Sequence, residues 1–256
     1  MEAKPITIIY EDDDLLVVNK PARITVNRAE TTKHEQTIQD WAEEKIGIIY
    51  KEAHIKYGEE GYSPIVEFSQ RGGVVHRLDK ETSGALILAK NAESFVELQK
   101  QFREREVEKV YKALAHGKIS PEEGEISVPV GRLPWNSKQF GIIPGGKESK
   151  TNYKVIGYYK AQKTKELFSF IELYPHSGRT HQIRVHLKYI GHPIFADYLY
   201  AGRKTARNDR KILPRVFLHA SQISIMHPVT KKKMTFVSDL PDELKIILTG
   251  FLHKES

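Results

Sequence analysis

The chain begins with short apolar blocks separated by polar ones. The apolar runs 6–10 and 15–18 flank the acidic residues 11–14. Apolar runs of this length are typical of strands, and a polar block between two of them is typical of a turn. The start of the chain therefore predicts a β-hairpin, in which the acidic residues form a solvated turn and not a metal site.

The next segment has the period of a helix. Apolar residues recur at helical spacing between Thr37 and Gly47, as in a helix that packs on a core. Thr37 is suited to an N-cap and Gly47 to a helix end. We expect a helix here, with Trp41 in the core rather than stacked on a base. Residues 51–71 are polar and contain glycine and proline, and we expect a loop.

Short apolar runs and helical patterns alternate through the rest of the chain, and no internal repeat stands out. Asn91 is suited to cap a helix that buries Phe95, Leu98 and Phe102. Strands are expected near residues 74–75, 85–89, 108–117, 153–158, 166–173 and 234–236, and further helices over residues 180–191 and from 241 onward.

The composition is that of a globular protein with a basic surface. The chain has 256 residues, 39% of them hydrophobic and 29% charged, which allows one large domain or two small ones. A net charge of +7 suits a polyanion such as nucleic acid. The absence of cysteine excludes disulfides, thiolate metal sites and cysteine nucleophiles. No apolar run approaches a membrane span and the N-terminus is no signal peptide, so we expect a cytoplasmic protein.

Residues 72–89 form the most informative stretch, because a dense charged loop lies between two apolar runs. Within it, Asp79 lies between Arg77 and Lys80. Nearby positive charge favours an ionised carboxylate, which makes Asp79 a candidate nucleophile. Residue types alone favour a surface loop with ordinary ion pairs.

Residues 76–84 resemble the defining motif of the RluA-type family of pseudouridine synthases, His-Arg-Leu-Asp followed by Thr-Ser-Gly. The Asp of that motif is the catalytic residue of the family and corresponds to Asp79. Other segments resemble family motifs in family order. They are Asn19-Lys20-Pro21, Lys109-x-Tyr111-x-Ala113, residues 178–186, and Gly191-His192-Pro193-Ile194 with Asp197 and Tyr200.

The chain departs from the family pattern at two places. The family continues its first motif with Ala-Gly, whereas Ala22 is followed here by Arg23. Arginine incurs a steric cost at positive φ that glycine avoids, so the backbone of this turn does not follow from the resemblance. Ala201 also separates Tyr200 from Gly202.

The resemblance implies roles for six residues. Asp79 would be the catalytic carboxylate, Arg184 its ion-pair partner, and Tyr111 the active-site tyrosine beside the uracil. Ile183 would line the uracil pocket. Arg77 would fill the space left by the flipped base or bind phosphate, and His76 is assigned with it to substrate binding.

The resemblance also implies a fold and a reaction. The expected fold is α+β, a mixed and largely antiparallel β-sheet core with flanking helices. Residues 1–256 would form a single catalytic domain without the S4-type domain that often precedes it, since the first strand begins near Ile6. The expected enzyme is an isomerase that converts uridine in tRNA or rRNA to pseudouridine after base flipping, as a monomer and without a cofactor.

We also expect no metal. Zinc helices place two histidines four residues apart, whereas His181 and His186 are five apart and point to different faces.

Two other classes of protein remain open. A glycoside or nucleoside hydrolase would need a second carboxylate across the bond, and Glu81 is the close candidate. An inactive RNA-binding module would have the same basic charge. The basic run 203–215 and the loop 129–151, which contains Trp135 and Phe140, are each either RNA contacts or solvated loops.

Overall fold

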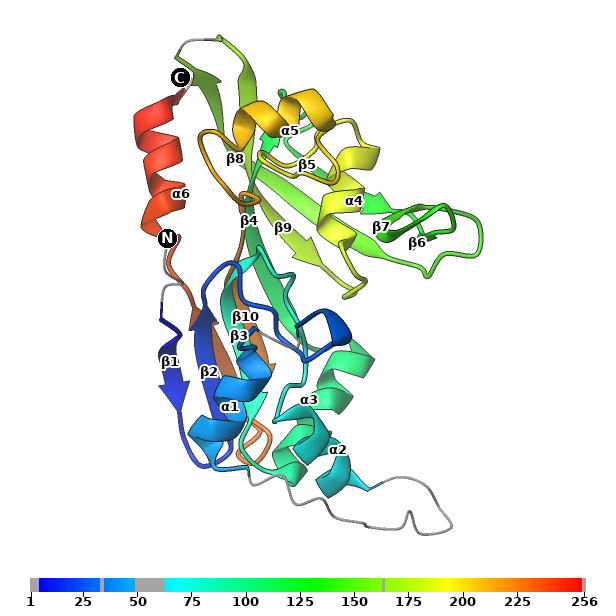
Figure 1. Ribbon diagram of the computed structural model, residues 1–256, viewed down its shortest axis with the longest axis vertical. Helices are drawn as coiled ribbons and strands as arrows, with labels where there is room; N and C mark the ends of the chain where they lie inside the picture. The colour runs from blue at the N-terminus through cyan, green and yellow to red at the C-terminus, as the bar shows by residue number, and fades with distance from the viewer. Residues whose placement is uncertain (1–4, 33–34, 49–62, 163, 255–256) are drawn as a thin grey trace. The chain divides into compact units, whose positions relative to one another are not determined.

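The computed structural model of the protein describes residues 5–32, 35–48, 63–162 and 164–254 (Figure 1). The chain divides into two compact units. Unit 1 comprises residues 1–107 and 222–238, and unit 2 comprises residues 108–221 and 239–256. Within the described part of the chain, no helix is long and apolar enough to cross a membrane.

Unit 1 is a sheet covered by helices, in which β1–β2, β2–β3 and β10–β11 pair antiparallel. Its strands follow the order β1-β2-β3-β10, with β11 paired to β10. The predicted hairpin is confirmed, because β1 and β2 pair antiparallel around residues 12–14. The strand bounds are β1 Thr7–Glu11, β2 Leu15–Lys20, β3 Ser83–Ala89, β10 Leu218–Met226, which begins in unit 2, and β11 Lys233–Val237.

The helices of unit 1 are α1 Ile38–Ile46, α2 Pro64–Arg71, α3 Ala92–Glu104 and the short 3-10 turn Glu30–Thr32. Phe68 of α2 and Phe95 and Leu98 of α3 share a buried cluster with Val17 and Ile87 of the sheet. The Asn91 side chain caps α3 by accepting the N–H of Ser94, as predicted.

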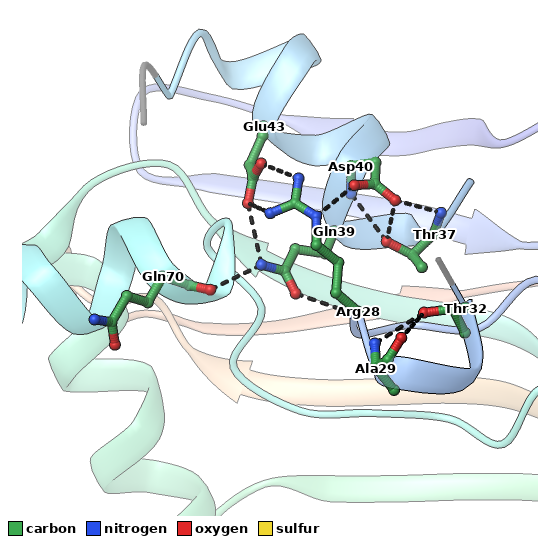
Figure 2. A network of polar contacts seen from close by, with 8 residues as sticks. All are labelled: Arg28, Ala29, Thr32, Thr37, Gln39, Asp40, Glu43 and Gln70. Carbon is green, nitrogen blue, oxygen red and sulfur yellow. Dashed lines mark hydrogen bonds and ion pairs between the residues drawn. The ribbon is translucent and has the colours of Figure 1, made fainter. Parts of the chain in front are cut away.

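Helix α1 has the predicted ends. Thr37 and Asp40 form a reciprocal capping box, and Gly47 ends the helix at φ 73°. Figure 2 shows that Arg28 contacts both Asp40 and Glu43 on this helix. Gln39 is bonded to the carbonyl of Gln70 at the end of α2, at 2.8 Å, and so connects the two helices (Figure 2). Trp41, expected in the core, is half-buried.

The loop predicted over residues 51–71 is wrong for residues 64–71, which form α2. Residues 51–62 of this prediction lie outside the described residues. Pro64 suits the first helical turn, where its missing N–H is not needed. Gly73 then turns the chain back toward β3 at φ 73°, and a Cβ there would lie 2.2 Å from the carbonyl oxygen of Ala89. Only glycine fits this close approach. Beyond it, the expected strand at residues 74–75 is reduced to a bridge between Val74 and Leu88.

Unit 2 contains a second antiparallel sheet region with the order β4-β9-β8-β12, and β5 pairs with β8. A separate hairpin is formed by β6 and β7, and Figure 1 shows it standing out beside α4. The strand bounds are β4 Glu108–His116, β5 Glu123–Ser127, β6 Val130–Leu133, β7 Asn136–Ile142, β8 Lys150–Ala161, β9 Leu167–Pro175 and β12 Leu252–Lys254.

The helices of unit 2 are α4 Gln182–Tyr189, α5 Arg203–Asp209 and α6 Asp242–Ile246, which continues as a π-helical turn over Ile247–Phe251. Its core gathers buried side chains from strands and connecting segments, among them Leu114, Ile171, Leu187, Phe195 and Phe217. Antiparallel strands with flanking helices confirm the α+β class.

Helix α4 begins at Gln182, later than predicted. His181 is its N-cap residue, at φ 58° and with no side-chain capping bond. The Gln182 side chain instead accepts hydrogen bonds from the N–H of Arg179 and the hydroxyl of Ser177, at 3.0 and 2.7 Å. It also donates to the carbonyl of Lys150 at 3.1 Å. One buried amide therefore attaches the start of α4 to β8.

Candidate active site

The loop that carries Asp79 is a tight turn leading into β3. The N–H of Thr82 bonds the carbonyl of Asp79 at 3.0 Å, and β3 begins at the next residue. Leu78 is buried beneath the turn, Asp79 is half-buried and Arg77 is exposed. The turn thus places a carboxylate and a guanidinium at the surface of unit 1 on a backbone anchored by the sheet.

A buried lysine fixes the backbone next to Asp79. Lys20 is fully buried, and its ammonium donates to the carbonyls of Pro21, Ile24 and Lys80 at 2.9, 2.8 and 3.3 Å. A buried ammonium is tolerated only with such partners. The N–H of Arg23 bonds the same Lys80 carbonyl at 2.6 Å. The Asn-Lys-Pro segment therefore supports the loop of Asp79.

Arg23 adopts the conformation that the sequence left open. Its φ is 75°, in the left-handed region that favours glycine. An arginine thus takes the geometry expected of the family's glycine, since the hydrogen bond to Lys80 holds its backbone.

His76 connects the motif to β3. Its Nε2 accepts the N–H of Ile87 at 2.9 Å, and its ring stacks on Phe102 with a centroid distance of 4.6 Å. These contacts attach the start of the motif to β3 and α3. The substrate-binding role of His76 stays a prediction, as does that of Arg77.

Tyr111 and Lys109 lie on the same face of β4, because they are two residues apart in a strand. Tyr111 is half-buried, pairs in register with Leu173 of β9 and packs against the core of unit 2. Burial lowers the pKa of Lys109 to about 8. Lys109 therefore titrates closer to neutral pH than an exposed lysine does, which the sequence motif did not indicate.

Arg184 projects from α4 and forms a buried ion pair with Asp197. Its Nε lies 2.7 Å from Oδ2, and its Nη2 lies 2.8 Å from Oδ1. The guanidinium also lies over the ring of Tyr200, 5.0 Å from its centroid. Neighbouring Ile183 is buried in the core of unit 2. Asp197 is the partner that sequence reasoning missed, although it belongs to a recognised motif.

The segment that carries Asp197 is itself clamped. Ala196 has φ 60°, which is strained for a residue with a Cβ. Its N–H donates to Asp209 at 3.0 Å, and its carbonyl accepts the Nε of Arg210 at 2.7 Å. The end of α5 therefore holds the strained peptide next to Asp197.

His116 supports this clamp from β4. Its two ring nitrogens lie 2.8 Å from Glu166 and 2.9 Å from Asp209. Burial by itself would lower the pKa of His116, but the hydrogen bonds to Asp209 and Glu166 outweigh it and raise the pKa to about 9. His116 is therefore a cation at neutral pH, bonded to two carboxylates.

The basic run after Tyr200 contains two kinds of residue. Arg210 bonds backbone carbonyls, and buried Arg215 pairs with Glu243 at 2.6 Å, so both stabilise the fold. The exposed cations of the run, which remain candidates for phosphate contact, are Arg203, Lys204, Arg207 and Lys211.

One cluster in the described part of the chain has the composition of a cation site: Asp12, Asp14 and His227, whose ligand atoms lie within 4.8 Å. His227 Nδ1 accepts two backbone N–H groups, so Nε2 carries the proton that bonds Asp12 at 3.0 Å. Hydrogen bonds from Tyr10 and from the Asp14 and Leu15 amides also reach Asp12. Against the opposing effect of burial, these bonds lower the pKa of Asp12 to about 2. The Asp12 and His227 side chains of this cluster are thus engaged in hydrogen bonds.

The histidines of α4 have separate partners as well. His181 Nδ1 bonds the hydroxyl of Tyr200 at 2.8 Å, whereas His186 Nε2 bonds Ser149 at 2.9 Å. Burial lowers the pKa of His186 to about 4, so its ring is neutral.

The six predicted site residues divide between the units. His76, Arg77 and Asp79 belong to the anchored loop of unit 1, and Tyr111, Ile183 and Arg184 belong to unit 2. The predicted ion pair between Asp79 and Arg184 joins different units and stays a prediction.

Comparisons with known proteins agree with the motifs. Residues 14–189 match the family model of RNA pseudouridylate synthases. Ribosomal large subunit pseudouridine synthase D of Nitrosomonas europaea is 32% identical over 251 residues, covering 96% of this chain and 65% of that protein. A protein of Chlorobaculum parvum named as an uncharacterized RNA pseudouridine synthase is 35% identical, covering 95% of this chain and 73% of that protein. The chain thus spans about two thirds of the length of these relatives.

A solved structure shares the fold. The human RNA pseudouridylate synthase domain containing 1 superposes with a TM-score of 0.72 and is 26% identical, covering 100% of this chain and 92% of that one.

Proposed function

Because this chain belongs to the RluA-type family of RNA pseudouridine synthases, we propose that it isomerises specific uridines of structured RNA to pseudouridine. In this reaction the N1–C1′ bond breaks, the base rotates, and a C5–C1′ bond forms. The proton leaves C5 and N1 gains one, so no cofactor or metal is required. A stacked base cannot rotate, and the target nucleotide must flip into a pocket.

The observation that carries this proposal is the anchored loop of Asp79. Its backbone is held by Lys20, Arg23 and β3, whereas Asp79 itself is half-buried and not in the core. A functional group on a rigid turn is preorganised for chemistry. We assign to Asp79 the role of nucleophile or base toward the target nucleoside.

The remaining roles belong to the same proposal. Arg184 pairs with Asp79 and orients it. A guanidinium has enough N–H donors to serve a second carboxylate besides Asp197. Tyr111 and Ile183 line the uracil pocket, and Tyr111 handles the proton lost from C5. Arg77 and His76 contact the flipped nucleotide or its phosphate.

The substrate is tRNA or rRNA, and the name of the Nitrosomonas relative makes large-subunit rRNA the first RNA to test. We further propose that residues 1–256 act as one catalytic domain. The monomeric state and the cytoplasmic location stay predictions.

The decisive experiment separates isomerase, hydrolase and inactive binding module. Unmodified rRNA and tRNA transcripts are incubated with the protein in a chelator, and nucleosides are then analysed by mass spectrometry. Pseudouridine formation supports the proposal. Free uracil with an abasic site would indicate a hydrolase, and bound but unchanged RNA would indicate a binding module. A transcript containing 5-fluorouridine should yield a rearranged nucleoside or a stable complex that depends on Asp79, because fluorine blocks the loss of a proton from C5.

A further inference from the structure

A pocket of about 250 Å³ lies in unit 2 between the β6–β7 hairpin and α4. Most of its wall is apolar or aromatic. Leu133 and Phe140 come from the hairpin, Val185 and Tyr189 from α4, and Tyr200 closes it from the segment after Asp197. Its volume accommodates one planar heterocycle and excludes a folded element. None of the residues assigned above to the uracil pocket lines it.

The pocket is held open by hydrogen bonds. The hydroxyl of Tyr200 accepts the N–H of Phe140 at 3.0 Å and also bonds His181. Gln139 donates to the carbonyl of Leu199 at 2.9 Å. These bonds attach the hairpin to the segment after Asp197. The pocket is therefore preorganised before a ligand binds.

The surroundings of the pocket favour an anion. Neither residues 130–147 nor residues 178–192 contain an aspartate or glutamate. Lys188 lies at the rim with an exposed side chain, and Arg132 lies over the ring of Phe140, 4.9 Å from its centroid. The nearby carboxylate Asp197 is buried and paired with Arg184. The walls therefore suit an aromatic group and the rim suits a negative charge.

The hairpin also exposes a large aromatic side chain. Trp135 at its two-residue turn is 77% exposed, and Tyr189 at the pocket is 57% exposed. Exposed aromatic rings among cations are how proteins bind unpaired nucleotides, since bases stack on the rings and phosphates meet the cations.

We propose that this pocket binds an unpaired nucleobase of the substrate RNA, outside the nucleotide that reacts, with the adjoining phosphate at Lys188. The base lies against Tyr189 and Phe140. This inference rests on the proposed function in one respect, which is that the ligand is RNA. The pocket and the hairpin then select RNAs in which a second base near the target is unpaired.

The test compares two exposed tyrosines. Tyr189→Ala removes a wall of the pocket, whereas Tyr198→Ala removes a side chain that is 65% exposed and does not line it. The probe is a short fluorescein-labelled oligouridylate, and its affinity is measured by fluorescence anisotropy. Loss of one stacking contact should weaken binding roughly tenfold for Tyr189→Ala, and Tyr198→Ala should stay within about twofold of the parent protein.

Photocrosslinking gives the second measurement. The same oligonucleotide with 4-thiouridine should crosslink to peptides containing Phe140 or Tyr189. Equal affinities of both variants and the parent protein, or crosslinks confined to other segments, would overturn the proposal. The rRNA assay above is run in parallel. Crosslinks in the pocket without pseudouridine formation would refute the isomerase activity and support the proposed base-binding pocket. Pseudouridine formation with unaltered RNA binding by Tyr189→Ala would support the isomerase activity and refute the pocket.

Discussion

Arg184 and Asp197 form a two-point ion pair inside unit 2, with the guanidinium Nε and Nη2 at 2.7 and 2.8 Å from the two carboxylate oxygens. Asp197 is fully buried and also accepts the N–H groups of Leu199 and Tyr200. The orientation of Arg184, the proposed partner of the catalytic carboxylate, is therefore set by a second carboxylate thirteen residues away.

Replacing this carboxylate tests its role. Asp197→Asn removes the carboxylate that pairs with the buried Arg184 guanidinium, and removing one member of a buried pair costs about 3–5 kcal/mol. Urea unfolding should show a loss of this order. The control Asp242→Asn removes an exposed carboxylate paired with Lys245 and should change stability by less than about 0.5 kcal/mol. Equal stabilities of the two variants would contradict the structural role of the pair.

Asp79→Asn should abolish pseudouridine formation and preserve RNA binding. Asparagine has nearly the same shape but is not a carboxylate nucleophile or base. Turnover is measured by nucleoside analysis and binding by filter retention of the rRNA transcript. The unfolding midpoint should stay within a few degrees of the parent protein, because Asp79 is half-buried on a surface turn. Appreciable turnover by a clean preparation would refute the assignment.

Because His116 is charged at neutral pH, the folded protein should lose stability as the pH becomes alkaline. The pKa of His116 is raised from 6.5 to about 9, so the stabilisation is fully present below pH 6.5 and is lost as pH rises through 9. The shift corresponds to something on the order of 3 kcal/mol. We expect the stability difference between the parent protein and His116→Gln to shrink over this range in urea unfolding experiments. Parallel stability curves for the two proteins would show that His116 does not bear the charge.

The exposed cations of α5 should contribute to RNA affinity through phosphate contacts. Arg207→Glu is expected to weaken binding and to reduce the slope of log affinity against log salt by roughly one. Arg210 is unsuitable for this test, because it bonds the carbonyl of Ala196. Lys245→Glu makes the same charge change on α6. If both variants bind RNA alike at each salt concentration, the basic run is a solvated surface.

The elements that were predicted correctly are those whose ends and pairing are determined by residues close together in the sequence. Helix α1 is an example, because Thr37, Asp40 and Gly47 define both of its ends by local hydrogen bonds and backbone preference. The hairpin of β1 and β2 is another. The motif around Asp79 was readable for the same reason, since its residues are contiguous.

Other features depended on partners distant in the chain. Arg23 takes a positive φ where its N–H reaches the carbonyl of Lys80. His116 is charged because Asp209, 93 residues later, is brought to its ring. Local preference cannot predict such contacts, because their free energy exists only once the chain has folded and excluded water. The sequence by itself determined the family, the α+β class and the candidate carboxylate. The tertiary structure decided which groups hold the site residues in place, because a buried charge pairs with whichever opposite charge the fold brings close to it.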